Sequence, residues 1–114
     1  MRTLLVLAML LLAAPAWAGS NVLSWTDNSS NEANFNIERK AEACAGTGAF
    51  GPLATVGANI STFTDAAVAE GTTYCYRVNA QNPGGVSGFS NTAARTVPFS
   101  VPNAPSGLGV SAGP

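Results

Sequence analysis

Hydrophobic and polar residues alternate in short runs along most of this chain. In residues 72–80, Tyr74, Tyr76 and Val78 fall on one face, and mainly polar residues fall on the other. A period of two over this length is typical of a half-buried β-strand. No segment beyond residue 18 shows a convincing helical period. The pattern therefore predicts an all-β domain.

Similar runs recur along the chain, separated by turns rich in Gly, Asn, Ser and Pro. The expected strands cover residues 21–27, 34–40, 52–56, 61–65, 72–80 and 86–97. Short strands at regular spacing predict two antiparallel sheets packed face to face, a β-sandwich. By their position in the alternation, Trp25, Tyr74 and Tyr76 are expected to point into its core.

Several blocks of the sequence carry a family resemblance. They are residues 23–40 (LSWTDNSSNEANFNIERK), 54–65 (ATVGANISTFTD), 71–82 (GTTYCYRVNAQN) and 87–93 (SGFSNTA). In this order and spacing they resemble fibronectin type III domains of bacterial secreted proteins, over about residues 22–96. The resemblance implies an immunoglobulin-like antiparallel β-sandwich. It also implies that the hydroxyl of Tyr74 bonds to the backbone of the preceding corner, although residues 68–71 lack the family's usual proline.

The ends of the chain depart from the family pattern. A domain of this kind begins with a first strand, yet almost nothing separates residue 18 from the strand expected at 21–27. A segment that resembles such a first strand instead lies at 101–112 (VPNAPSGLGVSA), where Leu108 and Val110 are its alternating apolar positions. The chain is therefore divided into residues 1–18, a domain at 19–97 without its own first strand, and a Pro/Gly-rich tail at 98–114.

Three interpretations of the tail compete. It can be the start of a further domain in a truncated fragment of a longer, multi-domain protein, and then stay disordered. It can fold back onto its own domain, a path that the linker barely spans. It can also donate the strand at 101–112 to a neighbouring copy and join molecules head to tail. An uncovered strand edge favours such pairing.

The first 18 residues are typical of a secretory signal peptide. Arg2 precedes an apolar run at residues 4–14, and residues 16–18 (AWA) form a cleavage motif. We therefore expect a secreted or periplasmic protein with no membrane insertion after cleavage. Export favours oxidation of Cys44 and Cys75. In the sandwich they are expected on the same outward face at neighbouring strand ends, which predicts a structural disulfide.

Composition excludes several functions. Without Arg2 the chain has four basic and six acidic residues and no histidine. Nucleic acid is not an expected partner, because phosphate binding needs a basic surface. Without histidine, no Ser-His or Cys-His nucleophile pair can form. Asp27 and Glu32 share one loop but are too few for a calcium site. We expect no catalytic residues, no metal and no cofactor.

The sequence thus indicates a non-catalytic exported module used for binding or spacing at the cell envelope or outside the cell. Two loops expected at one end of the sandwich are the candidate binding site; their residues are Asp27, Asn28, Asn31, Glu32, Asn82, Pro83, Gly84 and Gly85. The resemblance implies a protein or polysaccharide ligand. The alternative is a structural subunit that self-associates through its C-terminal tail.

Overall fold

The computed structural model describes residues 19–114. In that range the regular secondary structure consists of β-strands. The strands are β1 (Asn21–Ser24), β2 (Asn34–Lys40), β3 (Gly51–Gly57), β4 (Thr62–Asp65), β5 (Thr73–Asn82), β6 (Gly85–Val86) and β7 (Ala93–Thr96). The predicted signal peptide, residues 1–18, lies outside the described residues. Within residues 19–114, no helix is long and apolar enough to cross a membrane.

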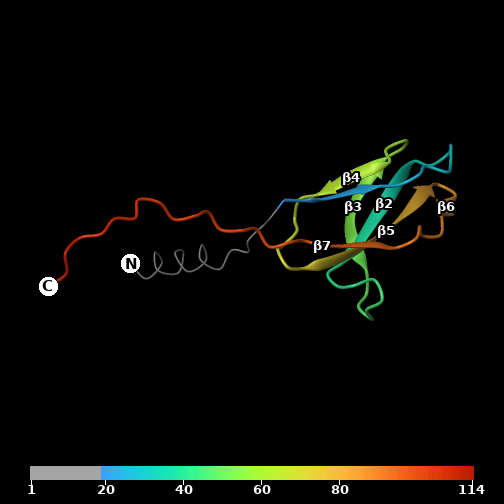
Figure 1. Cartoon of the computed structure of the whole chain (residues 1–114). Helices are drawn as coiled ribbons and strands as arrows, with labels where there is room; N and C mark the ends of the chain where they lie inside the picture. Colours follow the sequence, from blue (N-terminus) through green and yellow to red (C-terminus); the bar gives the residue numbers. More distant parts are fainter. Residues whose placement is uncertain (1–18) are drawn as a thin grey trace, which may run out of the picture.

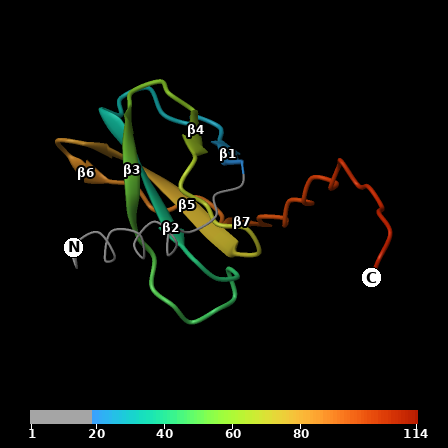
Figure 2. The ribbon, with the colours of Figure 1, turned by 90° about the vertical axis from the view of Figure 1, so that its left-hand side faces the viewer.

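The strands form two antiparallel sheets, as the alternation predicted (Figures 1 and 2). One sheet contains β1 and β4, and the other is ordered β3-β2-β5-β6, with β7 also paired to β5. In the central pair β2–β5, Phe35 lies opposite Ala80 and Ile37 opposite Val78. Residues directly opposite each other share a face. These side chains therefore point together toward the smaller sheet.

The hydrophobic core lies between the two sheets. The larger sheet supplies five buried side chains, Phe35, Ile37, Tyr74, Tyr76 and Val78, and Val68 and Val97 outside the strands are fully buried in the same core. From the smaller sheet and its margin, Leu23, Trp25 and Phe63 are only partly buried against them. The Trp25 ring meets the Phe35 ring edge-on, with centroids 5.6 Å apart. A two-stranded sheet cannot cover a five-stranded one completely, and this leaves one side of the core open.

The first strand is shorter than predicted. The expected strand at residues 21–27 ends at Ser24, and one further ladder-like bond joins Trp25 N–H to the Ser61 carbonyl at 3.0 Å. Beyond it, the Asp27 carboxylate accepts a hydrogen bond from the Ser29 N–H at 3.1 Å. Such a side-chain bond to the backbone two residues on favours a turn over a strand. Trp25 therefore follows the strand instead of lying within it.

The expected continuous strand at residues 86–97 is also wrong. The structure has two short strands, β6 and β7, separated by an irregular stretch at 87–92. In this stretch the hydroxyls of Ser87 and Ser90 accept the backbone N–H groups of Ala80 and Val78 at 2.8 and 3.0 Å. Serine hydroxyls thus take places that a regular ladder would give to carbonyl oxygens.

The corner between β4 and β5 contains the tyrosine contact that the family resemblance implied. The Tyr74 hydroxyl accepts a hydrogen bond from the Ala69 N–H at 2.9 Å. Gly71 has a φ of 75°, a left-handed conformation that favours glycine. Its N–H donates to the Val97 carbonyl at 2.7 Å. The corner therefore also holds the residue that follows β7.

On the outer face of the larger sheet, the predicted disulfide joins Cys44 to Cys75. A loop covers this end of the outer face. Cys75 is fully buried, and Lys40 is 7% exposed, because the loop at residues 41–50 folds over them. The Lys40 ammonium donates to the carbonyls of Cys44 and Gly46 at 3.1 and 2.8 Å. A buried cation thus organises the loop around itself.

Candidate functional site

The two predicted binding loops lie side by side. The Asn82 side chain donates from Nδ2 to the Asn31 carbonyl at 3.0 Å, and the Ala33 N–H donates to the Gln81 carbonyl at 2.7 Å. Asn28 and Asn31 are exposed, as are Pro83, Gly84 and Gly85. The structure therefore brings the residues of the sequence-based candidate site to one end of the sandwich. Whether they bind a ligand stays a prediction.

The carboxylates of these loops already have partners within the chain. Glu32 is 8% exposed and accepts hydrogen bonds from the Ser29 hydroxyl at 2.7 Å and the Asn59 N–H at 3.0 Å. The Ser29 hydroxyl contributes most to holding the pKa of Glu32 below its ordinary value. In the partner loop, the Asn82 side chain accepts the Gly84 N–H at 2.8 Å. These groups stabilise the turns of the loop end.

Residues 19–114 contain no group of three or more His, Cys, Asp or Glu side chains that could hold a metal ion.

Two phenylalanines on the outer face of the larger sheet stack against an arginine. The Arg77 guanidinium lies over the rings of Phe50 and Phe89, 4.2 and 3.7 Å from their centroids, and pairs with Glu38 at 2.7 Å. This stack fixes the loop at residues 41–50 over the sheet.

One feature that lacks a partner among the described strands is the edge of β1 that faces away from β4. Among the described strands, β1 pairs with β4, with Val22 opposite Thr64 and Leu23 opposite Phe63. Since Trp25 N–H bonds to β4, the alternation of an antiparallel ladder turns the backbone of Leu23 toward β4 as well. The N–H and C=O groups of Val22 and Ser24 therefore face away from β4, along an open edge.

A groove of about 710 Å³ runs beside this open edge. Its lining includes Val22 and Trp25 on one side, Tyr76 at the base, and Ala93 and Arg95 on the other side. Register places Ala93 opposite Tyr76 and Arg95 opposite Tyr74, so both share the inner face of the sheet. Yet all four residues of β7 are exposed. The groove is thus the uncovered side of the core, bounded by β1, β5 and β7.

The side chain of Trp25 contains a buried donor without a partner among the described residues. Its indole Nε1 is buried and has no hydrogen-bond acceptor within the described part of the chain. A buried N–H without a partner is costly, and most such groups in proteins are satisfied. The groove therefore combines an unpaired strand edge with a lining of both apolar and polar side chains.

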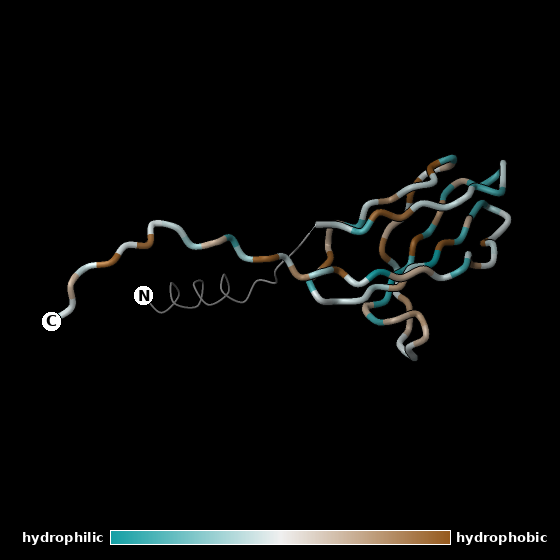
Figure 3. The backbone as a smooth tube through the Cα atoms, viewed as in Figure 1, coloured by the Kyte–Doolittle hydropathy of each residue, from teal (hydrophilic) through white to brown (hydrophobic). Residues whose placement is uncertain are grey.

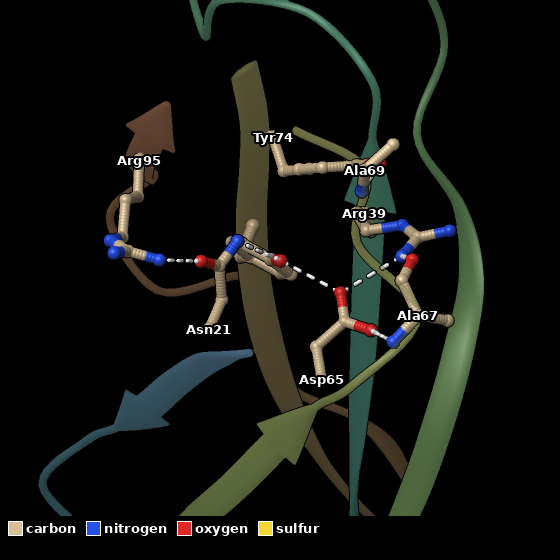
Figure 4. A network of polar contacts seen from close by, with 8 residues as sticks. Asn21, Arg39, Asp65, Ala67, Ala69, Tyr74 and Arg95 are labelled. Atoms are coloured by element: carbon tan, nitrogen blue, oxygen red, sulfur yellow. Dashed lines mark hydrogen bonds and ion pairs between the residues drawn. The ribbon is translucent and has the colours of Figure 1, made fainter. Parts of the chain in front are cut away.

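A polar network fixes one end of the groove (Figure 4). Arg95 donates to the Asn21 side chain at 2.6 Å, and Asn21 donates to the Tyr76 hydroxyl at 2.8 Å. Tyr76 donates to Asp65 at 2.7 Å, and Arg39 donates to the same carboxylate oxygen at 2.9 Å. The network crosses from β7 through both sheets to β2. It holds the start of β1 against the core, so the groove has a fixed wall.

Sequence reasoning missed this network, although a signal was present. Asp65 shares the inward parity of Phe63, and Asn21 shares that of Leu23. A polar residue at an inward position of a strand needs a buried partner. The partners come from strands distant in sequence, including Tyr76, and only the assembled sandwich identifies them.

Several known structures are similar to this fold. No family model matches the chain, and no curated protein matches it. The sixth fibronectin type III domain of human fibronectin type III domain containing protein 3 is 20% identical, with a TM-score of 0.58, over 80% of this chain and 84% of that one. A structure described as a myokine is 22% identical, with a TM-score of 0.57, over 73% and 86%.

The C. elegans twitchin kinase region (Fn31-NL-kin-CRD-Ig26) is 26% identical, with a TM-score of 0.58. That match covers 70% of this chain but 14% of the twitchin chain. The class defined by the strands is therefore an immunoglobulin-like antiparallel β-sandwich. Within that class, the chain has the fibronectin type III fold.

Proposed function

We propose that this protein is an exported, non-catalytic β-sandwich module that binds an extended polypeptide segment in the groove beside β1. The observation that carries the proposal is the open edge at Val22 and Ser24, which lies next to a groove lined by apolar and polar side chains. An added strand pairs with the backbone of such an edge and places alternate side chains in the groove. The backbone contacts supply affinity, and the side-chain contacts supply selectivity.

A polypeptide ligand fits this site better than a polysaccharide. The groove offers backbone groups in a linear row, which match the backbone of a strand. Export is supported by the Cys44–Cys75 disulfide, because disulfides persist in oxidising compartments.

Selection from a displayed library of random peptides tests the proposal, with the chain from Gly19 immobilised at low density. Trp25 is the single tryptophan after residue 18, so its fluorescence reports on the groove. We expect enriched peptides to alternate apolar and polar residues and to change that fluorescence. Val22→Pro removes one N–H from the groove edge and should weaken binding at least tenfold.

A matched control lies directly opposite in the same sheet. Thr64 pairs with Val22, and its N–H faces the other open edge of the sheet, away from the groove. Thr64→Pro should therefore leave peptide binding unchanged. Enriched peptides that bind the Val22→Pro chain as tightly as the parent would contradict the proposal, as would a selection without enrichment.

A further inference from the structure

We propose that the segment filling the groove is the tail of a second copy of this chain, so that molecules assemble head to tail. The inference rests on the proposed function, since it names the ligand of the same groove. Three observations carry it: the side-chain pattern of the tail, the position from which the tail leaves the domain, and the direction in which an antiparallel strand runs along β1.

The tail has the pattern of a strand but has no strand partner within the described structure. Leu108 and Val110 are 99% and 100% exposed. In an extended conformation they share one face with Ala112, while Gly109 and Ser111 occupy the other. Figure 3 shows hydrophobic positions recurring along the tail, away from the domain. One face of residues 108–112 is therefore suited to apolar walls and the other to solvent.

The tail leaves the sandwich at the end where β1 begins. Arg95, near the end of β7, donates to the Ser20 carbonyl and the Asn21 side chain at 3.3 and 2.6 Å. The exit is then fixed to the β4–β5 corner, because the Ser100 N–H and hydroxyl donate to the Glu70 carboxylate at 2.6 and 2.8 Å. From this point the tail projects away from its own groove (Figure 1).

An antiparallel partner of β1 has to enter beside Ser24 and leave beside Asn21. The tail of the same molecule starts at the Asn21 end, so it would first have to run back along the whole strand. A second molecule beyond the exit, with the Ser24 end of its β1 turned toward the tail, receives it without a reversal. Residues 101–107 reach at most about 25 Å from the fixed exit to that groove.

In this arrangement Leu108 and Val110 point into the neighbour's groove. They pack against apolar lining residues that include Leu23 and Trp25. The tail backbone pairs with the free groups of Val22 and Ser24. Donor and acceptor surfaces differ, so the contact is heterologous, and each added copy presents a new tail and a new groove.

Complementation between two variants tests the inference on the chain from Gly19. Leu108→Asp places a carboxylate on the apolar face of the tail and disables the donor. Val22→Pro removes an edge N–H and disables the acceptor. We expect light scattering to show a mass that rises with concentration for the parent chain, and monomers for each variant alone. An equal mixture should give heterodimers, because one intact tail still meets one intact groove.

Two controls separate donation from unrelated effects. Ser111→Asp adds the same charge on the opposite face of the tail, and Thr64→Pro alters the opposite edge of the sheet. For both variants, the concentration at which the mass rises should lie within about twofold of the parent value. Since Leu108 lies outside the core, its variant tests donation even if Val22→Pro fails to fold.

Several outcomes would overturn the inference. A parent chain that stays monomeric at every concentration excludes donation between copies. A parent that assembles equally well with Leu108→Asp associates through another surface. If library peptides bind the groove while the copies stay monomeric, the inference fails and the proposed function stands. If peptides and copies both fail to bind, the two proposals fall together.

Discussion

Tyr76 is the side chain through which the two sheets share a buried polar contact. Its hydroxyl accepts from Asn21 and donates to Asp65, and both of these residues are almost fully buried. Burial raises the pKa of Tyr76 to about 12, and the neighbouring Asp65 carboxylate contributes in the same direction. The phenol thus has to stay protonated for this contact to persist.

The raised pKa predicts a loss of stability in alkali. Tyrosine in the unfolded chain ionises near pH 10.0, whereas Tyr76 in the folded chain has a pKa of about 12. Between these values the folded state retains a proton that the unfolded state has released. The stability from this contact is fully present below pH 10.0 and falls as the pH rises to about 12. Urea unfolding across this range measures the slope.

Tyr76→Phe is the control for that titration. It should lower stability at neutral pH by about 1–3 kcal/mol, because buried Asn21 and Asp65 each lose a hydrogen-bond partner. It should also reduce the alkaline slope, since phenylalanine has no proton to release. Equal slopes in the parent and the variant would assign the alkaline loss to other groups.

At the scale of elements, the loop at residues 41–50 shows how a segment of small residues becomes ordered. Such a loop has few side chains to bury. It is held instead by the Cys44–Cys75 disulfide and by Lys40, whose ammonium donates to the Cys44 and Gly46 carbonyls. The disulfide lowers the conformational entropy of the unfolded chain, whereas Lys40 fixes the path of the loop in the folded state.

Removal of the disulfide should destabilise the domain. The bridge spans 31 positions, for which the chain-entropy treatment gives about 3–4 kcal/mol. A Cys44→Ser, Cys75→Ser double variant should lose that amount in urea unfolding at neutral pH. Reduction of the parent chain should have the same effect and free two thiols. Alkylation of both cysteines in the unfolded, unreduced parent would show that the bridge is absent.

At the scale of the whole molecule, the packed domain and the tail meet at one fixed exit. Phe99 lies over Gly71, where a Cβ atom would collide with its ring, and Ser100 is bonded to Glu70. The Ser100 N–H contributes most to lowering the pKa of Glu70. Beyond the exit, Val101 is 87% exposed. The tail therefore divides into an anchored start and a free remainder.

This division predicts different effects for two shortened chains. At low concentration, a chain ending at Ser100 should melt at the same temperature as the full chain, since the anchored residues remain. A chain ending at Val97 should melt a few degrees lower, because the contacts with Glu70 and Gly71 are lost. Calorimetry at matched dilution measures both. A lower melting temperature for the first chain would mean that residues 101–114 already contact a domain in the monomer.

The sequence by itself determined the fold class and most of the strands. A period of two in residues 72–80 fixes which side chains of β5 face the core, because strand geometry is local. The alternation likewise predicted that Tyr74 and Tyr76 are buried and that Cys44 and Cys75 share one face. The strand at 34–40 was predicted with the bounds of β2. Such patterns depend on neighbouring residues and can be read without tertiary contacts.

The tertiary structure alone decided the features that depend on distant partners. It ended β1 at Ser24, divided the strand expected at 86–97, and buried Lys40 beneath a loop. It also placed β1 and β7 on either side of a groove, although they lie about 70 residues apart in the chain. A groove is the space left by side chains from several strands, so no local pattern specifies it. The sequence predicted a missing strand, and the packing of the sheets determined the site left open.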